Sequence, residues 1–447
     1  MKNNIMRIKT ILYILVLVFS FQNFSFAQEV LDEQKVLTIE EAVEIALKNN
    51  YDIAIASNEL KIDKENATIG NAGFLPRVDA TATNNYNIQN INQTRTDGNV
   101  LAEDNAKSNN IQYGVNLGWT IFDGFNMFSQ YEQLKEVENL GESQLKLTIL
   151  NRVTDVMTLY MDMVQAQQQL KAVDSLIVIS QQRLTTAQNR FTIGKAAKLE
   201  VLNAEVDLNT DITTQLRQLE SYKNTRSRLN ELLSRDINSK FIVTDIVEVD
   251  KNLELLTLID LASKENPEIL NQVISKRIAE LELKKVKGNY LPTVAVNTGY
   301  NFADSESSLG FTSVSSTRGL NYGFSASLNL FDGFAQKRKS QVAKLQIENA
   351  QINIEKQRKN IESSLTAAYE TYLTNLQLID LEKKNEAIAK ENLEITLVKY
   401  RIGTINTLEF RTAQLNYTNA QVRFAEAQYQ AKMSEISLKA LAGNLSL

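Results

Sequence analysis

The chain contains no cysteine and no histidine among its 447 residues. These absences exclude Ser-His-Asp and Cys-His nucleophilic sites, Cys/His zinc sites and imidazole acid–base chemistry. A phosphate-binding G-x-x-x-x-G-K-[ST] loop is also missing. The net charge of −5 provides no basic surface of the kind that binds nucleic acid. We therefore expect no enzyme activity, no metal site, no cofactor and no nucleic-acid partner.

Proline and glycine are nearly absent from two long stretches. Residues 125–191 contain no proline and one glycine, Gly141, and residues 334–402 contain neither. A continuous helix over either stretch would span about 100 Å. In the first stretch an apolar residue recurs at every seventh position: Ile149, Val156, Met163, Leu170, Ile177, Leu184 and Phe191. This repeat indicates helices that wind side by side, and a fibrous stalk remains open as an alternative for this segment.

Residues 1–27 have the pattern of a secretory signal peptide. Three basic residues precede an apolar run at residues 11–21, and Ser25-Phe26-Ala27 provides a small-x-small cleavage site. An uncleaved membrane anchor is the alternative. The apolar run is short for a membrane span.

The second half of the chain repeats the first. Phe122-Asp123-Gly124-Phe125 returns as Phe331-Asp332-Gly333-Phe334, 209 residues later. Gly194 with Leu199-Glu200 returns as Gly403 with Leu408-Glu409 at the same offset, and Leu75-Pro76 returns as Leu291-Pro292 at an offset of 216. The sequence therefore predicts a tandem duplication, with repeats at residues 28–236 and 257–447 and a connecting equatorial segment at 237–256.

Each repeat has the same predicted plan. Two helices, a pair of strands, a long helix and a returning helix follow one another. In the first repeat these elements are expected at 39–48, 52–70, about 77–90, 111–123, 125–191 and 199–234. In the second repeat they are expected at 257–264, 267–288, about 293–303, 320–331, 334–402 and 408–442.

The predicted strands alternate apolar and polar residues, as outer-membrane strands do. Ile111–Ile121 and Leu320–Leu330 alternate over eleven positions, and the polar positions carry Asn, Ser, Thr, Gln and Gly without charge. We expect a lipid-facing belt made of Tyr113, Trp119, Tyr300 and Phe324. Polar loops are expected to join the strands at 89–110 and 303–319. The alternative is a soluble sheet with one wet face.

Four strands cannot close a membrane barrel, because known barrels have about eight or more. An open sheet would leave unpaired backbone groups in lipid. Several chains must therefore share one barrel. Two chains would give eight strands and a filled interior, and three would give twelve strands and space for a pore.

This plan resembles the TolC family of outer-membrane efflux proteins over residues 36–444. The resemblance rests on the duplicated Leu-Pro, Phe-Asp-Gly and Gly…Leu-Glu motifs. It implies a mainly α fold with a membrane β-barrel, with four strands and four tunnel-forming helical segments per chain. It also implies a homotrimer whose 12-stranded barrel continues as a 12-helix periplasmic tube.

The resemblance further implies a passive exit duct of a tripartite efflux system in the outer membrane of a Gram-negative-type bacterium. Its cargo would be drugs, toxic compounds or metal ions. Its partners would be outer-membrane lipid, a periplasmic adaptor (membrane fusion protein) and an inner-membrane pump of the RND, ABC or MFS type. The alternatives are the outlet of a type I protein-secretion system and, from a different class, a structural coiled-coil stalk.

Gly194 and Gly403 each follow a long helix, where glycine usually takes a positive φ and ends the helix. Under the resemblance these turns are the periplasmic tips of the tunnel. The expected adaptor-docking residues are Gly194, Leu199, Glu200, Gly403, Leu408 and Glu409.

The resemblance also implies a gate at the tips, formed by Tyr400, Glu200 and Glu409. Some relatives close the tunnel with a comparable Tyr–acid link and add an arginine two residues after the second glycine. That position is Ile405 here, so we expect a weaker latch. Thr412 stands where some relatives carry a second acid. Alternatively, Tyr400 ends the apolar seam of its helix, as Phe191 does in the first repeat.

Overall fold

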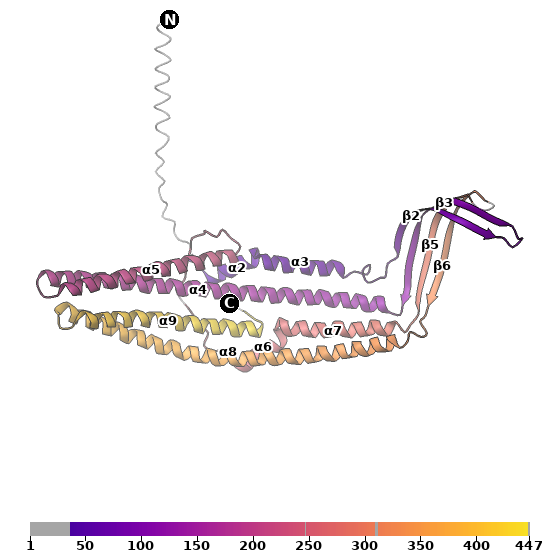
Figure 1. The fold of residues 1–447 in the computed structure, drawn as a ribbon. Helices are drawn as coiled ribbons and strands as arrows, with labels where there is room; N and C mark the ends of the chain where they lie inside the picture. Colours follow the sequence, from indigo (N-terminus) through magenta and orange to yellow (C-terminus); the bar gives the residue numbers. More distant parts are fainter. Residues whose placement is uncertain (1–35, 246, 309–311, 446–447) are drawn as a thin grey trace, which may run out of the picture.

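The computed structural model describes residues 36–245, 247–308 and 312–445. The predicted signal peptide, residues 1–27, lies outside the described residues. The described chain is a long helical layer with a four-stranded sheet at one end (Figure 1).

The elements follow one order in both repeats. The first repeat contains α2 (Ile39–Asn49), α3 (Tyr51–Asn66), β2 (Arg77–Thr94), β3 (Val100–Asp123), α4 (Asn126–Thr192) and α5 (Lys198–Leu232). The second contains α6 (Leu255–Glu265), α7 (Pro267–Gly288), β5 (Thr293–Ser307), β6 (Val314–Ser327), α8 (Ala335–Ile402) and α9 (Thr407–Ala442). Near the middle of the layer, β1 (Val36–Leu37) pairs in parallel with β4 (Ile242–Val243).

The helices α4 and α8 run the full length of the layer, with 67 and 68 residues. The helices α5 and α3 lie end to end beside α4, and α9 and α7 lie end to end beside α8 (Figure 1). Contacts between α4 and α5, α4 and α9, and α8 and α9 give the order α5–α4–α9–α8 in the half away from the sheet. The helices α5 and α8 are therefore the two edges of that half.

One asparagine per repeat connects the helices that lie end to end. Asn50 caps α3 by accepting from the backbone N–H groups of Asp52 and Ile53, and its side-chain amide donates to the carbonyl of Leu232 at the end of α5. Asn266 caps α7 in the same way and donates to Leu441 at the end of α9. Each buried asparagine satisfies orphan backbone groups of two helices at once.

The repeated Phe-Asp-Gly-Phe motif forms the turn from strand to long helix. Gly124 and Phe125 both have positive φ, 73° and 68°, and Asp123 accepts from the backbone N–H of Met127 in the first helical turn. Glycine is required at position 124 because a Cβ there would lie 2.1 Å from the carbonyl oxygen of Gly288. The same turn recurs at Gly333 and Phe334 before α8.

The sheet is antiparallel in the order β2-β3-β5-β6, so β3 and β5 join the two repeats. The pairs Tyr113–Phe302, Val115–Tyr300 and Trp119–Val296 fix the register between the central strands. Because side chains alternate along a strand, this register places the apolar residues of all four strands on one face. The other face carries an asparagine ladder, in which the Asn301 amide donates to Asn116 at 3.1 Å and to Asn321 at 3.0 Å.

The predicted loop at 89–110 is wrong, because most of it is strand. The strands β2 and β3 extend to Thr94 and from Val100, well beyond the part that pairs with β5. A register shift between Gln89 and Ile91 accompanies a bend of the hairpin away from the rest of the sheet (Figure 1). The second predicted loop, 303–319, is also too long, since β5 ends at Ser307 and β6 begins at Val314.

Two predicted element ends also need correction. The last strand was expected at 320–331, but β6 ends at Ser327. The helix expected at 52–70 ends at Asn66, and turns follow it up to β2. Both misplaced ends lie where the chain passes between the helices and the sheet.

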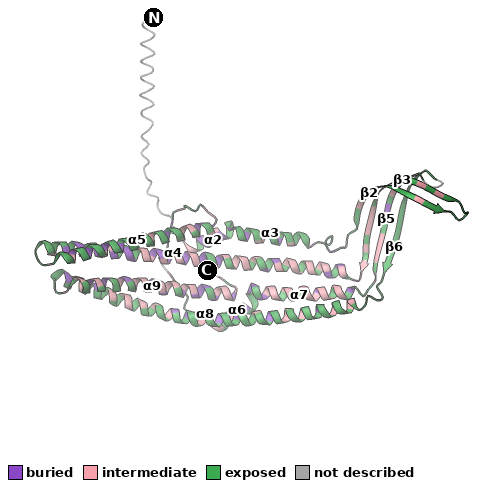
Figure 2. Cartoon of the chain, in the orientation of Figure 1, coloured by how far each residue is buried: buried purple, intermediate pink, exposed green. Residues whose placement is uncertain are grey.

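The main core lies at the middle of the layer, where α2 and the short β1–β4 sheet cover α4. Its buried members include Val156, Tyr160, Met163, Leu229 and Ile436. A second core gathers α6, α7, α8 and α9 around Leu365 and Tyr372. Figure 2 shows buried positions near the middle of the layer, whereas α5 and α8 are mostly exposed.

Candidate functional site

The two helical hairpins, α4–α5 and α8–α9, end in matching turns. Gly194 and Gly403 have φ of 75° and 82°, which is the left-handed conformation that the sequence predicts. In each turn the residue after the glycine donates its backbone N–H to a carbonyl five residues back, Lys195 to Arg190 at 2.8 Å and Thr404 to Lys399 at 3.0 Å. This bond satisfies the last carbonyls of the long helix and lets the chain reverse at once.

The predicted docking residues lie at equivalent places on the two tips. Leu199 and Leu408 occupy the first turns of α5 and α9, and both are exposed. Glu409 is exposed too, whereas Glu200 is partly buried. The tips therefore present apolar side chains to solvent at two equivalent positions per chain.

The structure brings Tyr400 and Glu200 together. Tyr400, in the last turn of α8, is fully buried and donates its hydroxyl to Glu200 Oε1 of α5 at 3.0 Å. Its ring stacks on Phe410 of α9, with centroids 5.0 Å apart. Burial raises the pKa of the Tyr400 phenol, and the hydrogen bond and negative charge of Glu200 raise it further. The contact therefore links the two hairpins through a neutral phenol and a carboxylate.

A third residue, Arg190 at the end of α4, completes this contact. Its guanidinium forms an ion pair with Glu200, with Nη1 and Oε1 3.4 Å apart, and lies 5.4 Å from the centre of the Tyr400 ring. The side chains of Arg190 and Glu200 are only 19% and 16% exposed. We refer to Tyr400, Glu200 and Arg190 as the tip latch. Ile405 packs against the apolar cluster around Tyr400 and brings no charge to the tip latch, so the weaker latch stays a prediction.

Glu409 does not join the tip latch within one chain. Its backbone N–H donates to Asn406 Oδ1 and its carboxylate accepts from the Asn406 amide, both at 2.9 Å. This reciprocal pair caps the N-terminus of α9. Thr412 is exposed and donates its hydroxyl to the carbonyl of Leu408 at 3.0 Å. Among the described residues of the same chain, the contacts of Glu409 thus stay within its own helix cap and do not reach Tyr400. The gate role of Glu409 stays a prediction.

The four predicted belt residues lie on the apolar face of the sheet. Tyr113 stacks on Phe302 with centroids 4.8 Å apart, and Trp119 donates its indole N–H to the carbonyl of Phe74 at 2.8 Å. Tyr300 and Phe324 are exposed on the same face. Their amphipathic or apolar rings suit a membrane interface.

Sequence reasoning missed Arg190, although the duplication contains a signal for it. Arg190 precedes Gly194 by four residues, as Lys399 precedes Gly403, so a basic residue lies one helical turn before each tip. The spacing predicts a basic residue at both tips, but it does not predict which acidic residue forms an ion pair with it. The ion pair between Arg190 and Glu200 depends on how the helices pack.

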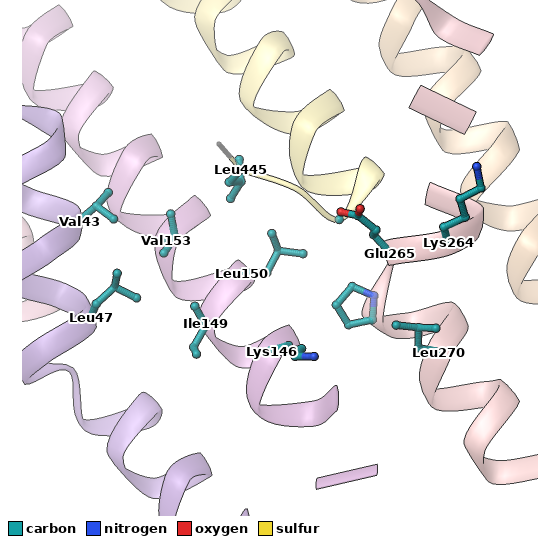
Figure 3. Close-up of a pocket in the computed structure, with 12 residues that line it drawn as sticks. Val43, Leu47, Lys146, Ile149, Leu150, Val153, Lys264, Glu265, Leu270 and Leu445 are labelled. Atoms are coloured by element: carbon teal, nitrogen blue, oxygen red, sulfur yellow. The ribbon is translucent and has the colours of Figure 1, made fainter. Parts of the chain in front are cut away.

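A cavity of about 680 Å³ lies between α2 and α4 on one side and the α6–α7 junction on the other (Figure 3). Apolar side chains including Val43, Leu47 and Ile149 line it, with Lys146 and Glu265 at its margin. It holds none of the predicted site residues. Within the described ranges, no group of three or more acidic residues is placed to hold a metal ion. No helix of the described chain is long and apolar enough to cross a membrane.

Comparison with known proteins places these features in a family. The family profile described as outer membrane efflux protein matches residues 42–235 and 258–444. The outer membrane protein TolC of Vibrio cholerae serotype O1 is 20% identical over 386 residues, covering 86% of this chain and 85% of that protein. The proteases secretion protein PrtF of Dickeya chrysanthemi is 19% identical over 412 residues, covering 91% and 88%.

Solved structures show the same fold. The CmeC outer membrane channel of Campylobacter jejuni superposes with a TM-score of 0.76 at 18% identity, covering 91% of this chain and 85% of that one. The duplicated hairpins, the tip turns and the four-stranded sheet thus belong to one known architecture.

Proposed function

Because the chain belongs to the outer membrane efflux protein family, we propose that it is the exit duct of a tripartite efflux system. In this proposal a periplasmic adaptor and an inner-membrane pump deliver drugs, toxic compounds or metal ions, and the chain conducts them passively through the outer membrane of a Gram-negative-type bacterium. The observation that carries the proposal is the continuous plan of a sheet with one apolar face joined to a helical layer about 100 Å long. A structural coiled-coil stalk does not account for the family match or for the sheet.

The unpaired edges of the chain support a homotrimer. Strands β2 and β6 end the sheet, and α5 and α8 end the helical layer, so the first repeat provides one edge and the second repeat the other. A head-to-tail ring would pair β6 with β2 and α8 with α5 of the next copy. Three copies would form a barrel of twelve strands on a tube of twelve helices, whereas two would form a barrel of eight strands without a pore.

The exposed apolar stripes on these edges fit such a ring. On α8 four of the exposed apolar residues recur at every seventh position, the spacing of a coiled-coil seam: Leu381, Ile388, Ile395 and Ile402. On α5 the large exposed apolar residues are Leu199, Leu202, Val206, Ile212 and Leu216. In a single chain both apolar stripes are exposed to water. In the ring, the α8 stripe of one copy would pack against the α5 stripe of the next, and both would be buried.

The proposed mechanism assigns one task to each part of the chain. The apolar face with Tyr113, Trp119, Tyr300 and Phe324 would contact lipid, and the asparagine ladder would line the pore. The adaptor would dock at the exposed tips, and the tip latch would hold the hairpins together until it docks. The chain would supply no energy and perform no chemical step.

Dye extrusion in cells tests the proposal. Cells that lack the chain are expected to retain ethidium, and an intact copy should restore its export. The second candidate is a type I protein-secretion outlet. It would be favoured if cells lacking the chain retained no more ethidium than wild-type cells and no longer released a secreted protein into the culture medium. The similarity to a proteases secretion protein is the observation that favours that candidate.

A further inference from the structure

A buried polar cluster connects the two hairpins further from the tips than the latch. Arg411 of α9 binds Asp211 of α5 through two hydrogen bonds, Nη1 to Oδ2 at 2.8 Å and Nη2 to Oδ1 at 2.7 Å. Ser180 of α4 donates to Asp211 Oδ2 at 2.5 Å, and the Gln414 amide of α9 donates to Ser180 Oγ at 2.6 Å. We refer to Ser180, Asp211, Arg411 and Gln414 as the ion-pair joint.

The joint is more enclosed than the tip latch. The Arg411 and Asp211 side chains are 12% and 4% exposed, and Ser180 and Gln414 are fully buried. Arg411 and Asp211 make a bidentate, charge-assisted contact, which is the strongest form of side-chain hydrogen bonding. Separating them would leave a buried carboxylate without its partner, and such a charge is far more costly than an exposed one. At the tip latch one hydrogen bond, from Tyr400 to Glu200, and the Arg190 cation beside the Tyr400 ring connect the hairpins. The Arg190–Glu200 ion pair lies within the first hairpin, so the latch breaks before the joint.

The joint has no counterpart in the other repeat. At the offset of 209 residues, Arg411 corresponds to Leu202 and Asp211 corresponds to Ala420. Leu202 is exposed on α5, the edge that the proposed ring turns toward the next copy. The ion-pair joint therefore connects the two hairpins within one chain. At the α5 edge, the equivalent position carries the apolar side chain of Leu202.

We propose that the ion-pair joint is a fixed pivot of the gate, an inference that rests on the proposed duct function. When the tip latch opens, the hairpins separate only beyond the joint, and the Arg411–Asp211 contact stays intact. Asp211 lies 11 residues along α5 from Glu200, so the movable end of α5 is about 16 Å long. Arg411 lies four residues after the start of α9 at Thr407, so the movable end of α9 is about one helical turn. On the side of the joint toward the sheet, the two hairpins of each chain move as one rigid body. Neighbouring copies then slide against each other along the apolar residues of α8 and α5.

Hydrogen exchange on the intact trimer tests the pivot without altering it. The variant Tyr400→Phe/Glu200→Gln breaks the tip latch, and its amide exchange is compared with that of wild type. We expect at least tenfold faster exchange in peptides covering 190–200 and 400–407, with unchanged exchange at 176–183 and 411–418. Equal acceleration at 176–183 and 411–418 would overturn the pivot, because the hairpins would then separate through the joint.

Bilayer conductance of a second variant provides an independent test. Arg411→Met/Asp211→Leu replaces the charges with apolar groups of similar size, and we expect its pore to stay as closed as wild type. Combined with the latch variant, it should conduct several-fold more than the latch variant alone, because the hairpins can then separate further. An open pore from the joint variant alone would make the joint a second latch, and no added conductance in the combination would remove its role.

The two failures are distinguishable. If the duct function itself is wrong, the tip-latch variant does not conduct and cells lacking the chain export ethidium normally. If only the pivot is wrong, the tip-latch variant conducts and cells lacking the chain retain ethidium, as a duct requires. The exchange pattern or the conductance of the joint variants then contradicts the inference.

Discussion

At the residue scale, the proposed gate rests on one buried phenol and two charged groups beside it. A hydrogen bond to a charged group contributes about 1.5–3 kcal/mol, which is about tenfold or more in an equilibrium constant. Tyr400→Phe combined with Glu200→Gln should therefore raise the single-channel conductance or open probability of the reconstituted protein at least tenfold. A double variant as closed as wild type would leave Tyr400 as a packing residue only.

Arg190 carries a separate prediction. Arg190→Gln removes the ion pair with Glu200 and the cation beside the Tyr400 ring, a loss of about 1 kcal/mol for a partly exposed pair. The open probability should rise about fivefold, less than in the double variant. Lys195→Gln is the matched control, since Lys195 is an exposed cation on the same tip. An equal rise in open probability in Arg190→Gln and Lys195→Gln would contradict a specific role of the Arg190–Glu200 pair. It would indicate that the total positive charge of the tip affects the gate.

At the scale of elements, the sheet face that the register defines should meet lipid. Leu117 lies opposite Val78 and Thr298 on the apolar face. Leu117→Arg should impair assembly by about 2–4 kcal/mol if it lies at mid-depth in lipid, and trimer yield in outer membranes measures this. Gln112→Arg, on the opposite face, should assemble normally. Equal yields of the two variants would contradict the assignment of the faces.

The tip turn provides a second prediction at this scale. Gly403 has a φ of 82°, which a larger residue adopts only with strain. Gly403→Leu should abolish ethidium export while trimers remain in the membrane, because the tip proposed to dock the adaptor would change shape. Thr404→Leu adds the same bulk next to it, at a position without a positive φ, and should retain export. Loss of export in both variants would point to bulk at the tip and not to the turn.

Long periodic elements were predictable from the sequence, and the connections around them were less so. The helices expected at 125–191 and 334–402 correspond to α4 and α8 because heptads and missing proline act along the chain itself. The extension of β2 and β3 was not predictable, since residues 89–110 are mostly polar and lack the regular alternation of apolar and polar residues that marks a half-buried strand.

The candidate site was predictable only in part. The duplicated glycines located both tips, and the family resemblance identified Tyr400 and Glu200. Arg190, and the Arg411–Asp211 pair, became visible only in the structure, because contacts between separate helices depend on packing. The same holds for Asn50 and Asn266, whose offset of 216 matches that of the Leu-Pro motifs but does not reveal the helix ends they connect.

At the scale of the whole molecule, a single chain is incomplete in two places at once. Its sheet ends in unpaired strands β2 and β6, and its helical layer ends in the exposed faces of α5 and α8. Open strand edges are not tolerated in lipid. In a closed ring of copies, the same rotation pairs the free strand edges and covers the exposed helix faces. The proposed duct is therefore one continuous tube.

Electron cryo-microscopy of the detergent-extracted, full-length protein tests whether copies of the chain close into such a ring. We expect a three-fold particle in which β6 pairs with β2 and α8 packs against α5 of the next copy, with a pore through twelve strands and a tube of twelve helices closed at the tips. A two-fold particle with a filled barrel of eight strands, or single chains whose sheet edges remain unpaired, would contradict it.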